Sequence, residues 1–230
     1  MIETVTRDTG AASAGLRQND IILALDTTEI VNCDGLVKEI QAREAGQAIK
    51  IKIDRGGAAQ TLETTLPSRA DVLRKRHVGM QIPLKMVTRV DDMNVTSLAA
   101  AGKTTIVGWF DQDRCSTCAS AFSKIQDWTK TKKGAGISVV GVTASNYKSI
   151  PETLADLKKA QRNYDVPLLL ADNDTFQELS ITDIKRIHFM VVDCRGIITY
   201  VTPLKPDADD RGAVLDELYS ATEQAARRMK

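Results

Sequence analysis

The sequence predicts a small, mostly β unit of the α+β class, followed by a larger α/β domain with a central mixed sheet flanked by helices. Three observations support this prediction. Residues 1–66 contain short strand patterns and a hairpin signal, whereas apolar strands alternate with helices from Gly79 onward. A proline and then a charged stretch separate the two patterns. We therefore expect one domain over residues 1–67, a linker over 68–78 and a second domain over 79–230.

The composition is ordinary for a folded globular protein and argues against global disorder, with 43% hydrophobic and 27% charged residues among 230. The 31 Lys and Arg residues nearly balance the 30 Asp and Glu residues, which argues against nucleic-acid binding driven by bulk charge. The longest apolar runs fall short of the ~18 residues of a membrane helix. We therefore expect neither a nucleic-acid partner nor a membrane-spanning segment in this chain.

In the N-terminal part, short elements follow one another closely. They are expected as strands at residues 2–6, 20–26, 49–54 and 60–66, a helical turn at 11–16, and a helix from Asn32 or Asp34 to about Arg43. Leu36, Val37 and Ile40 share one face of that helix. The pair Gly56-Gly57 is typical of a hairpin turn.

In the C-terminal part, buried-type strands alternate with amphipathic helices. Strands are expected at residues 104–110, 137–143, 168–171, 188–193 and 196–201, and helices at 116–130, 151–164, 175–179 and 209–229. This order is typical of a layered α/β domain.

Cys115 and Cys118 form a C-x-x-C pair where a buried strand gives way to a helix. Backbone N–H groups and the helix dipole favour a thiolate over a thiol at that place. The second cysteine, one turn along, can close a disulfide and resolve a mixed disulfide. Arg114 would favour the thiolate further, whereas Asp111 and Asp113 would oppose it. The pattern favours a redox dithiol.

Two other roles for the pair stay open. A zinc half-site needs two more ligands, and the spacing of His77, His188, Cys33 and Cys194 fits no common zinc module. The second alternative is a structural or redox-silent disulfide. We expect no metal and no cofactor, and the sequence offers no support for a bridge between Cys33 and Cys194.

Several C-terminal segments keep the order and spacing of a known family. They are Gly102-Lys103, residues 105–110, the C-x-x-C pair, residues 137–143 and the V-V-D-C-R-G of residues 191–196. Through them, residues 79–230 resemble the thioredoxin superfamily, closest to its TlpA-like and peroxiredoxin-like branch. The resemblance implies a central sheet flanked by helices, with Cys115 as the attacking and Cys118 as the resolving thiol.

Three features depart from that family's pattern. Arg114 replaces the usual tryptophan, the residues between the cysteines lack the frequent proline, and Ile187 stands at the family's cis-proline position. A cis bond before a non-proline residue costs ~2.5–4 kcal/mol, so we expect a trans peptide there. The substrate groove should then differ, and His188 could approach the sulfurs as a proton donor or ligand. A strand histidine with its own partner is the commoner situation.

The stretch of residues 5–26 reads V-T-R-D-T-G-A-A-S-A-G-L-R-Q-N-D-I-I-L-A-L-D. Through it, residues 2–66 resemble the later part of a PDZ domain of the kind found in bacterial proteases and secreted enzymes. The resemblance implies that a peptide adds as a strand beside the helix carrying Leu36, Val37 and Ile40. The family's first strands would precede residue 1, so we expect a PDZ-like domain lacking them and a gene product that extends upstream. An envelope or periplasmic location would fit such a longer product, and a cytoplasmic one a complete chain.

These features together predict a bacterial thiol–disulfide oxidoreductase that exchanges its C-x-x-C disulfide with a protein or peptide thiol. The PDZ-like module would dock the partner. The alternative is a non-catalytic scaffold that has lost turnover because Ile187 replaces the cis-proline. Peroxide reduction ranks lower, because the sequence lacks a T-x-x-C context at Cys115.

Overall fold

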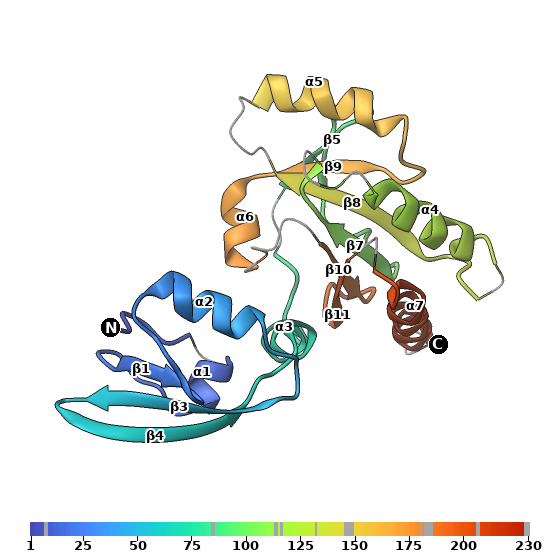
Figure 1. Ribbon diagram of the computed structural model, residues 1–230. Coiled ribbons are helices and arrows are strands. Elements are labelled where there is room, and N and C mark those ends of the chain that lie inside the picture. The colour runs from blue at the N-terminus through green and yellow to red at the C-terminus, as the bar shows by residue number, and fades with distance from the viewer. Residues whose placement is uncertain are drawn as a thin grey trace. The chain divides into compact units, whose positions relative to one another are not determined.

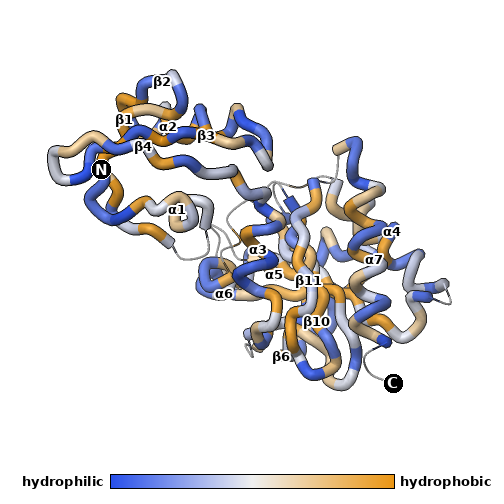
Figure 2. The backbone as a smooth tube through the Cα atoms, turned by 90° about the horizontal axis from the view of Figure 1, so that it is seen from below, coloured by the Kyte–Doolittle hydropathy of each residue, from blue (hydrophilic) through white to orange (hydrophobic). Residues whose placement is uncertain are grey.

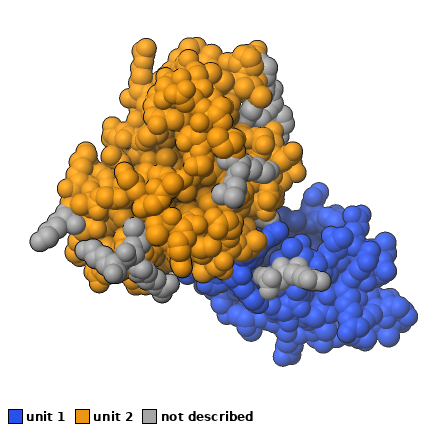
Figure 3. All heavy atoms as spheres, turned by 180° about the vertical axis from the view of Figure 1, so that it is seen from behind, with its two compact units in different colours: residues 1–76 blue, residues 77–230 orange. Residues whose placement is uncertain are grey.

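A computed structural model of the protein describes residues 1–6, 9–83, 86–112, 115, 117–131, 133–144, 150–179, 181, 186–205 and 208–227. The chain divides into two compact units, residues 1–76 and residues 77–230, which Figure 3 colours separately. Among the described helices, none is long and apolar enough to cross a membrane.

The described part of the N-terminal unit contains an antiparallel sheet with the strand order β2-β1-β3-β4. The elements up to the end of this unit are α1 (Gly10–Ser13), β1 (Ile21–Leu25), β2 (Thr28–Glu29), α2 (Cys33–Gln41), β3 (Ala48–Arg55), β4 (Ala58–Thr65) and α3 (Arg69–His77). The side chain of Asn32 accepts a hydrogen bond from the Gly35 N–H at 2.8 Å and caps α2, one of the two predicted starts. Gly56 and Gly57 have φ of 64° and 87° and form the predicted β3–β4 turn.

Two N-terminal segments differ from the sequence-based expectation. Residues 2–6 do not form a strand; Ile2 instead exchanges two backbone hydrogen bonds with the turn at Asn19 and Asp20. The segment expected as a linker, 68–78, is largely helical as α3. Ser68 caps this helix, because its hydroxyl accepts the Asp71 N–H at 3.0 Å and donates to the Asp71 carboxylate at 2.6 Å.

The C-terminal unit, in the residues described, contains a mixed sheet with the strand order β11-β10-β7-β8-β9-β5-β6 (Figure 1). Its elements are β5 (Met86–Arg89), β6 (Val95–Ser97), β7 (Thr105–Trp109), α4 (Cys118–Thr129), β8 (Ser138–Ala144), α5 (Ile150–Gln161), β9 (Leu168–Ala171), α6 (Asn173–Glu178), β10 (Ile187–Val192), β11 (Ile198–Leu204) and α7 (Arg211–Arg227). β7, β8 and β9 run parallel, whereas β10, β11, β5 and β6 join as antiparallel strands. The sequence patterns predicted all of these elements except the β5–β6 hairpin.

Helices cover both faces of this sheet. One buried cluster joins α4, α5 and α7 to the same sheet face, which carries Ile106, Leu168 and Phe189. On the other face, α6 packs its Phe176 edge-on against Trp109, with ring centroids 5.2 Å apart. Figure 2 shows that β10 is mostly apolar, and all six of its residues, His188 included, are buried. Every Phe, Tyr and Trp residue of the protein lies in this unit.

Candidate active site

The predicted C-x-x-C pair forms a disulfide between the end of β7 and the start of α4. Cys115 and Cys118 are bonded, with their Cα atoms 5.4 Å apart, and Cys118 is the first residue of α4. Thr117 is the N-cap residue, and within the described residues its side chain makes no capping hydrogen bond. The Cys118 N–H donates to the carbonyl oxygen of Cys115 at 3.4 Å, and the positive end of the helix dipole at the start of α4 favours a thiolate there.

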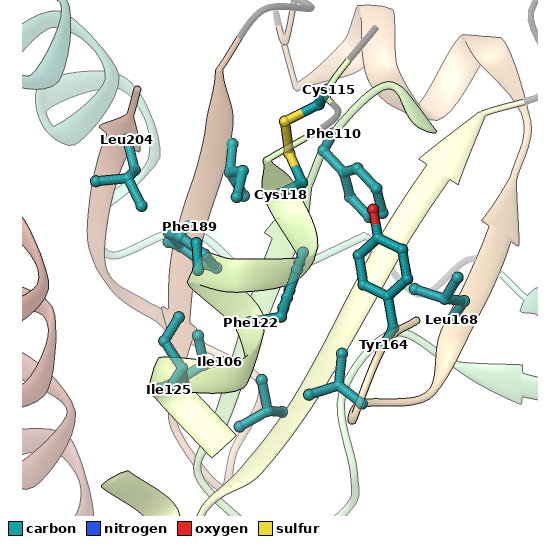
Figure 4. Close-up of a cluster of buried hydrophobic side chains, with 14 of the residues drawn as sticks. Ile106, Phe110, Cys115, Cys118, Phe122, Ile125, Tyr164, Leu168, Phe189 and Leu204 are labelled. Atoms are coloured by element: carbon teal, nitrogen blue, oxygen red, sulfur yellow. A yellow bond between two sulfur atoms is a disulfide. The ribbon is translucent and has the colours of Figure 1, made fainter. Parts of the chain in front are cut away.

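The two sulfur-bearing residues differ in their burial. Cys115 is 6% exposed and Cys118 is fully buried. Both belong to the buried cluster under α4, and Figure 4 shows the disulfide beside Phe110, at the top of that helix. Of the two residues, only Cys115 therefore has any exposed surface.

Two glycines position α4, and with it Cys118, on the sheet. Gly108 of β7 lies opposite Gly141 of β8 in the parallel register. A Cβ atom at Gly108 would lie 2.6 Å from the Phe122 ring, and one at Gly141 would lie 3.3 Å from it. The paired glycines thus leave a space in the sheet surface that the ring of Phe122 fills.

A group of aromatic rings supports the start of α4. The ring centroids of Phe110 and Phe122 are 5.3 Å apart, and the Tyr164 ring lies 5.5 Å from Phe110 and 5.8 Å from Phe122. The Tyr164 hydroxyl donates a hydrogen bond to Oε1 of Gln112 at 2.8 Å. Burial raises the pKa of Tyr164 to about 12. Sequence analysis did not single out Tyr164 or Gln112, because nothing in their spacing indicates that they meet.

Ile187 and His188 lie on opposite faces of the sheet. Ile187 is fully buried in the cluster that holds both cysteines. None of the described peptide bonds is cis, so the peptide before Ile187 is trans, as expected. His188 is also fully buried, but it pairs across the strands with Trp109, on the face covered by α6. The structure therefore does not bring His188 to the sulfurs, because neighbouring residues of a strand point to opposite faces.

Three further residues that the sequence analysis named are one cation and two cysteines outside the C-x-x-C pair. Arg114 lies outside the described residues. Cys33 is exposed and Cys194 is half-buried, and both are free cysteines rather than members of a bridge among the described residues. No group of three or more potential metal ligands gathers in the described part of the chain.

In the N-terminal unit, the predicted groove residues lie beside an apolar pocket. The pocket has a volume of about 180 Å³ and is lined by Met1, Ile2, Ile21, Ile22, Ile30, Val31, Asn32, Cys33 and Leu36. Leu36 also packs against the core of this unit, whereas Val37 and Ile40 are 50% and 41% exposed. Of the three predicted groove residues, Leu36 thus lines the pocket, whereas Val37 and Ile40 lie on the same helix outside its lining.

A second pocket, which sequence analysis missed, lies at the turn between β10 and β11. Its volume is about 220 Å³ and its lining comprises Gln81, Ile82, Pro83, residues 97–101, Cys194, Arg195 and Gly196. Residues 97–101 carry no motif that would have indicated it. The turn follows the end of β10 that pairs with the start of β7, so it lies at the opposite end of β7 from the disulfide.

Comparisons with known proteins agree with this division into two units. The family model described as PDZ domain matches residues 1–66. A comparison with curated protein sequences finds no significant match.

Solved structures similar to this chain include three bacterial proteins. The thioredoxin domain of a thiol-disulfide oxidoreductase from Bacteroides vulgatus is 19% identical, with 62% of this chain and 97% of that one covered and a TM-score of 0.43. A thioredoxin-like protein from Porphyromonas gingivalis is 17% identical, with 64% and 95% covered and a TM-score of 0.47. Peroxiredoxin Q from Xanthomonas campestris is 13% identical, with 65% and 99% covered and a TM-score of 0.48.

The topology of the C-terminal unit supports its fold assignment directly. It has a parallel β7–α4–β8 unit with the disulfide at the start of α4, and an antiparallel β10–β11 hairpin followed by α7. The central mixed sheet flanked by helices is the arrangement that the family resemblance implied. The chain therefore joins an N-terminal segment matched by the PDZ domain family to a C-terminal unit with a thioredoxin-like fold and a C-x-x-C disulfide.

Proposed function

We propose that the protein exchanges disulfides with thiols of a partner protein, with Cys115 as the attacking and Cys118 as the resolving sulfur. The observation that carries the proposal is the disulfide itself, closed at the start of α4 between a slightly exposed residue and a fully buried one. Such a difference in access suits an attacking and a resolving role, because the outer sulfur meets the partner and the inner one completes the exchange.

The reaction follows from these positions. In the reduced protein, the Cys115 thiolate attacks one sulfur of a partner disulfide and forms a mixed disulfide. The other partner sulfur leaves as a thiolate and takes up a proton. Cys118 then loses its proton and attacks the sulfur of Cys115, which releases the second partner thiol. The partner gains two electrons, and the Cys115–Cys118 disulfide closes; the reverse sequence oxidises a partner dithiol.

The N-terminal unit would supply docking in this proposal. The match of residues 1–66 to the PDZ domain model supports it, as does the apolar pocket beside α2. The exposed side chains of Val37 and Ile40 extend the apolar surface next to that pocket. A short apolar peptide segment of the partner fits this chemistry.

Single cysteine variants test the exchange reaction. We expect Cys118→Ser to accumulate a mixed disulfide with a model peptide disulfide, because the resolving thiol is missing. Cys115→Ser should accumulate none. Non-reducing gels and mass spectrometry measure both. Trapping by Cys115→Ser rather than Cys118→Ser would reverse the two roles.

The reduction potential of the pair provides a second test. Equilibration in defined thiol and disulfide buffers, followed by alkylation and peptide mapping, measures it. A potential between roughly −120 and −270 mV supports exchange chemistry, whereas a value below about −300 mV indicates a structural disulfide. A potential in the lower range would favour the alternative function, a scaffold without turnover. The 6% exposure of Cys115 would agree with such a structural disulfide.

Docking is tested separately with a displayed library of random peptides. We expect the wild-type protein to select apolar peptides and Val37→Asp to lose this selection, because a charge at this half-exposed position disrupts the apolar surface. Lys38→Glu is the matched control, since it changes charge on the same helix. Equal selection by wild type and Val37→Asp would contradict docking at this surface.

A further inference from the structure

A hydrogen bond connects the turn after α5 to the segment that leads into the disulfide. Tyr164 is 7% exposed, and its hydroxyl donates to Oε1 of Gln112 at 2.8 Å. Gln112 is half-buried and stands three residues before Cys115 in the sequence. Tyr164 is thus bonded, in the described structure, to the strand-to-helix connection that carries the reactive pair.

The Tyr164 ring is itself fixed by its packing. It lies against Phe110, the first residue after β7, and against Phe122 on α4. Figure 4 shows the Tyr164 ring next to Phe110, which in turn lies near the disulfide at the top of α4. The packing of the ring therefore already fixes the position of the hydroxyl. Forming the hydrogen bond costs little further side-chain entropy.

The backbone around Tyr164 is held by one neighbouring amide side chain. Gln161 donates from Nε2 to the carbonyl oxygens of Tyr164 at 3.3 Å and Val166 at 2.9 Å. Its Oε1 accepts the N–H of Leu168, the first residue of β9, at 2.8 Å. The turn that carries Tyr164 is therefore tied to the sheet.

The Tyr164 hydroxyl keeps its proton over the pH range of thiol exchange. Burial raises the pKa of Tyr164 to about 12, so the group remains a hydrogen-bond donor through neutral and mildly alkaline pH. The contact with Gln112 therefore does not switch as the cysteine thiols ionise.

We propose that Tyr164 is a positioning residue for the disulfide: by bonding to Gln112 and packing on Phe110 and Phe122, it fixes the described residues that follow β7 and the start of α4, so that Cys115 and Cys118 stay close enough to bond. The proposal rests on the proposed exchange function. An intramolecular disulfide gains stability when its two sulfurs are held close before they react. A constraint on the connection raises the effective concentration of one thiol toward the other, and its loss should make the disulfide easier to reduce.

The first experiment compares Tyr164→Phe with the wild-type protein in glutathione redox buffers. The variant keeps the packed ring and loses only the hydroxyl. We expect the equilibrium constant for disulfide formation to fall about fivefold, which corresponds to a potential about 20 mV more oxidising. A change smaller than about 1.5-fold would overturn the proposal.

Tyr200→Phe is the matched control. The Tyr200 hydroxyl donates to Glu217 at 2.8 Å, so this variant also loses one hydroxyl hydrogen bond. Tyr200 lies opposite Val191, near the start of β7 and away from the cysteines. We expect its disulfide equilibrium to match the wild type. An equal shift in both tyrosine variants would mean a general loss of stability and would also overturn the proposal.

The partner residue provides an independent second test. Gln112→Met keeps the length of the side chain but removes the acceptor oxygen, Oε1. We expect the equilibrium constant for disulfide formation to fall as much as in Tyr164→Phe. Gln112→Glu keeps an acceptor oxygen and should restore most of the wild-type value. The double variant Tyr164→Phe/Gln112→Met should fall no further than either single variant. Additive falls would show that the two residues act separately.

A failure of this inference can be told apart from a failure of the proposed function. The glutathione equilibrium needs no partner protein, so the effect of Tyr164→Phe can be measured even if the wild type traps no peptide disulfide. A wild type without exchange but with a Tyr164-dependent disulfide would overturn only the proposed function. A wild type that exchanges, with a disulfide indifferent to Tyr164, would overturn only this inference.

Discussion

The two units bury their strands in different ways. In the C-terminal unit all five residues of β7 and all six of β10 are buried, because helices cover both faces of the sheet. In the N-terminal unit β3 alternates between buried and exposed residues, and no residue of β4 is fully buried. The disulfide thus lies in a unit whose sheet is covered by helices on both faces. The candidate docking surface lies in a unit whose sheet has one face exposed to solvent.

This difference has a physical reason. A disulfide needs a fixed frame for two sulfurs, and close packing on both sides of a sheet supplies one. A docking surface needs exposed apolar groups, and a unit packed on one side leaves them on α2 and near β1. The following variants test how far the two units depend on these two kinds of packing.

The largest effect is expected at Gly108. A Cβ atom there would lie 2.6 Å from Phe122 and 2.7 Å from Phe189. We expect Gly108→Ala to destabilise the C-terminal unit by about 3 kcal/mol through overpacking. Gly212→Ala is the control, because its added Cβ meets nothing within 4 Å. Hydrogen exchange measured for each unit should show the loss only after residue 77. An intact C-terminal unit would mean that Phe122 can move aside.

The N-terminal unit should instead depend on an ion pair at the edge of its core. Arg55 donates to both carboxylate oxygens of Asp20 at 2.8 Å, and Asp20 also accepts the Arg17 N–H. The hydrogen bond from Arg55, the largest cause, lowers the pKa of Asp20 to about 2 from 3.8. A carboxyl with a lowered pKa stabilises the fold above its unfolded pKa. That contribution is lost as the pH falls from about 4 to 2.

We therefore expect Arg55→Gln to weaken the N-terminal unit at neutral pH and to flatten its stability between pH 4 and pH 2. Hydrogen exchange at pH 5, 3.5 and 2.5 measures this for each unit. The C-terminal unit in the same molecule is the internal control. If the variant kept the acid dependence of the wild type, another carboxyl would be responsible.

A smaller effect is expected where α4 meets α7. Trp128 and Tyr219 stack with ring centroids 4.5 Å apart and an interplanar angle of 10°. We expect Tyr219→Leu to cost the C-terminal unit about 1 kcal/mol, since the aromatic stacking is lost and the apolar volume is largely kept. Urea denaturation measures the change. The disulfide equilibrium should stay at the wild-type value, and a shift in it would extend the positioning role to α7.

The smallest effect is expected at Cys33. This cysteine is exposed at the start of α2. We expect Cys33→Ser to change the free energy of unfolding by less than about 0.5 kcal/mol, as for most surface substitutions. The disulfide equilibrium should also stay unchanged. A clear shift in that equilibrium would link Cys33 to the pair and contradict the separation of the two units' roles.

The sequence predicted most elements because their signals are local. Asn32 caps a helix and Gly56-Gly57 turns a hairpin without help from distant residues. The helix α3 also had a local signal, the Ser68-x-x-Asp71 capping box. The many charged residues of segment 68–78 favoured a linker instead. The β5–β6 hairpin had little signal, because its two strands are short and its turn places the non-glycine Met93 at a φ of 62°.

The sequence predicted the two cysteines of the candidate site but not the residues that pack around them. The C-x-x-C spacing and its place after a strand identified Cys115 and Cys118. The hydrogen bond from Tyr164 to Gln112 joins residues 52 positions apart, and no local pattern encodes such a contact. His188 was predictable as buried. Its separation from the sulfurs depends on which residue of β10 faces α4, a register set by the pairing with β7.

The uneven distribution of aromatic residues makes the two units optically distinct. Both Trp and all four Tyr residues belong to the C-terminal unit, so the N-terminal unit is nearly transparent at 280 nm. Intrinsic fluorescence consequently follows the C-terminal unit and does not report the unfolding of the N-terminal unit. A single tryptophan introduced at Val37 would be the only one in the N-terminal unit, and the difference between the variant and wild-type spectra would report on the docking surface.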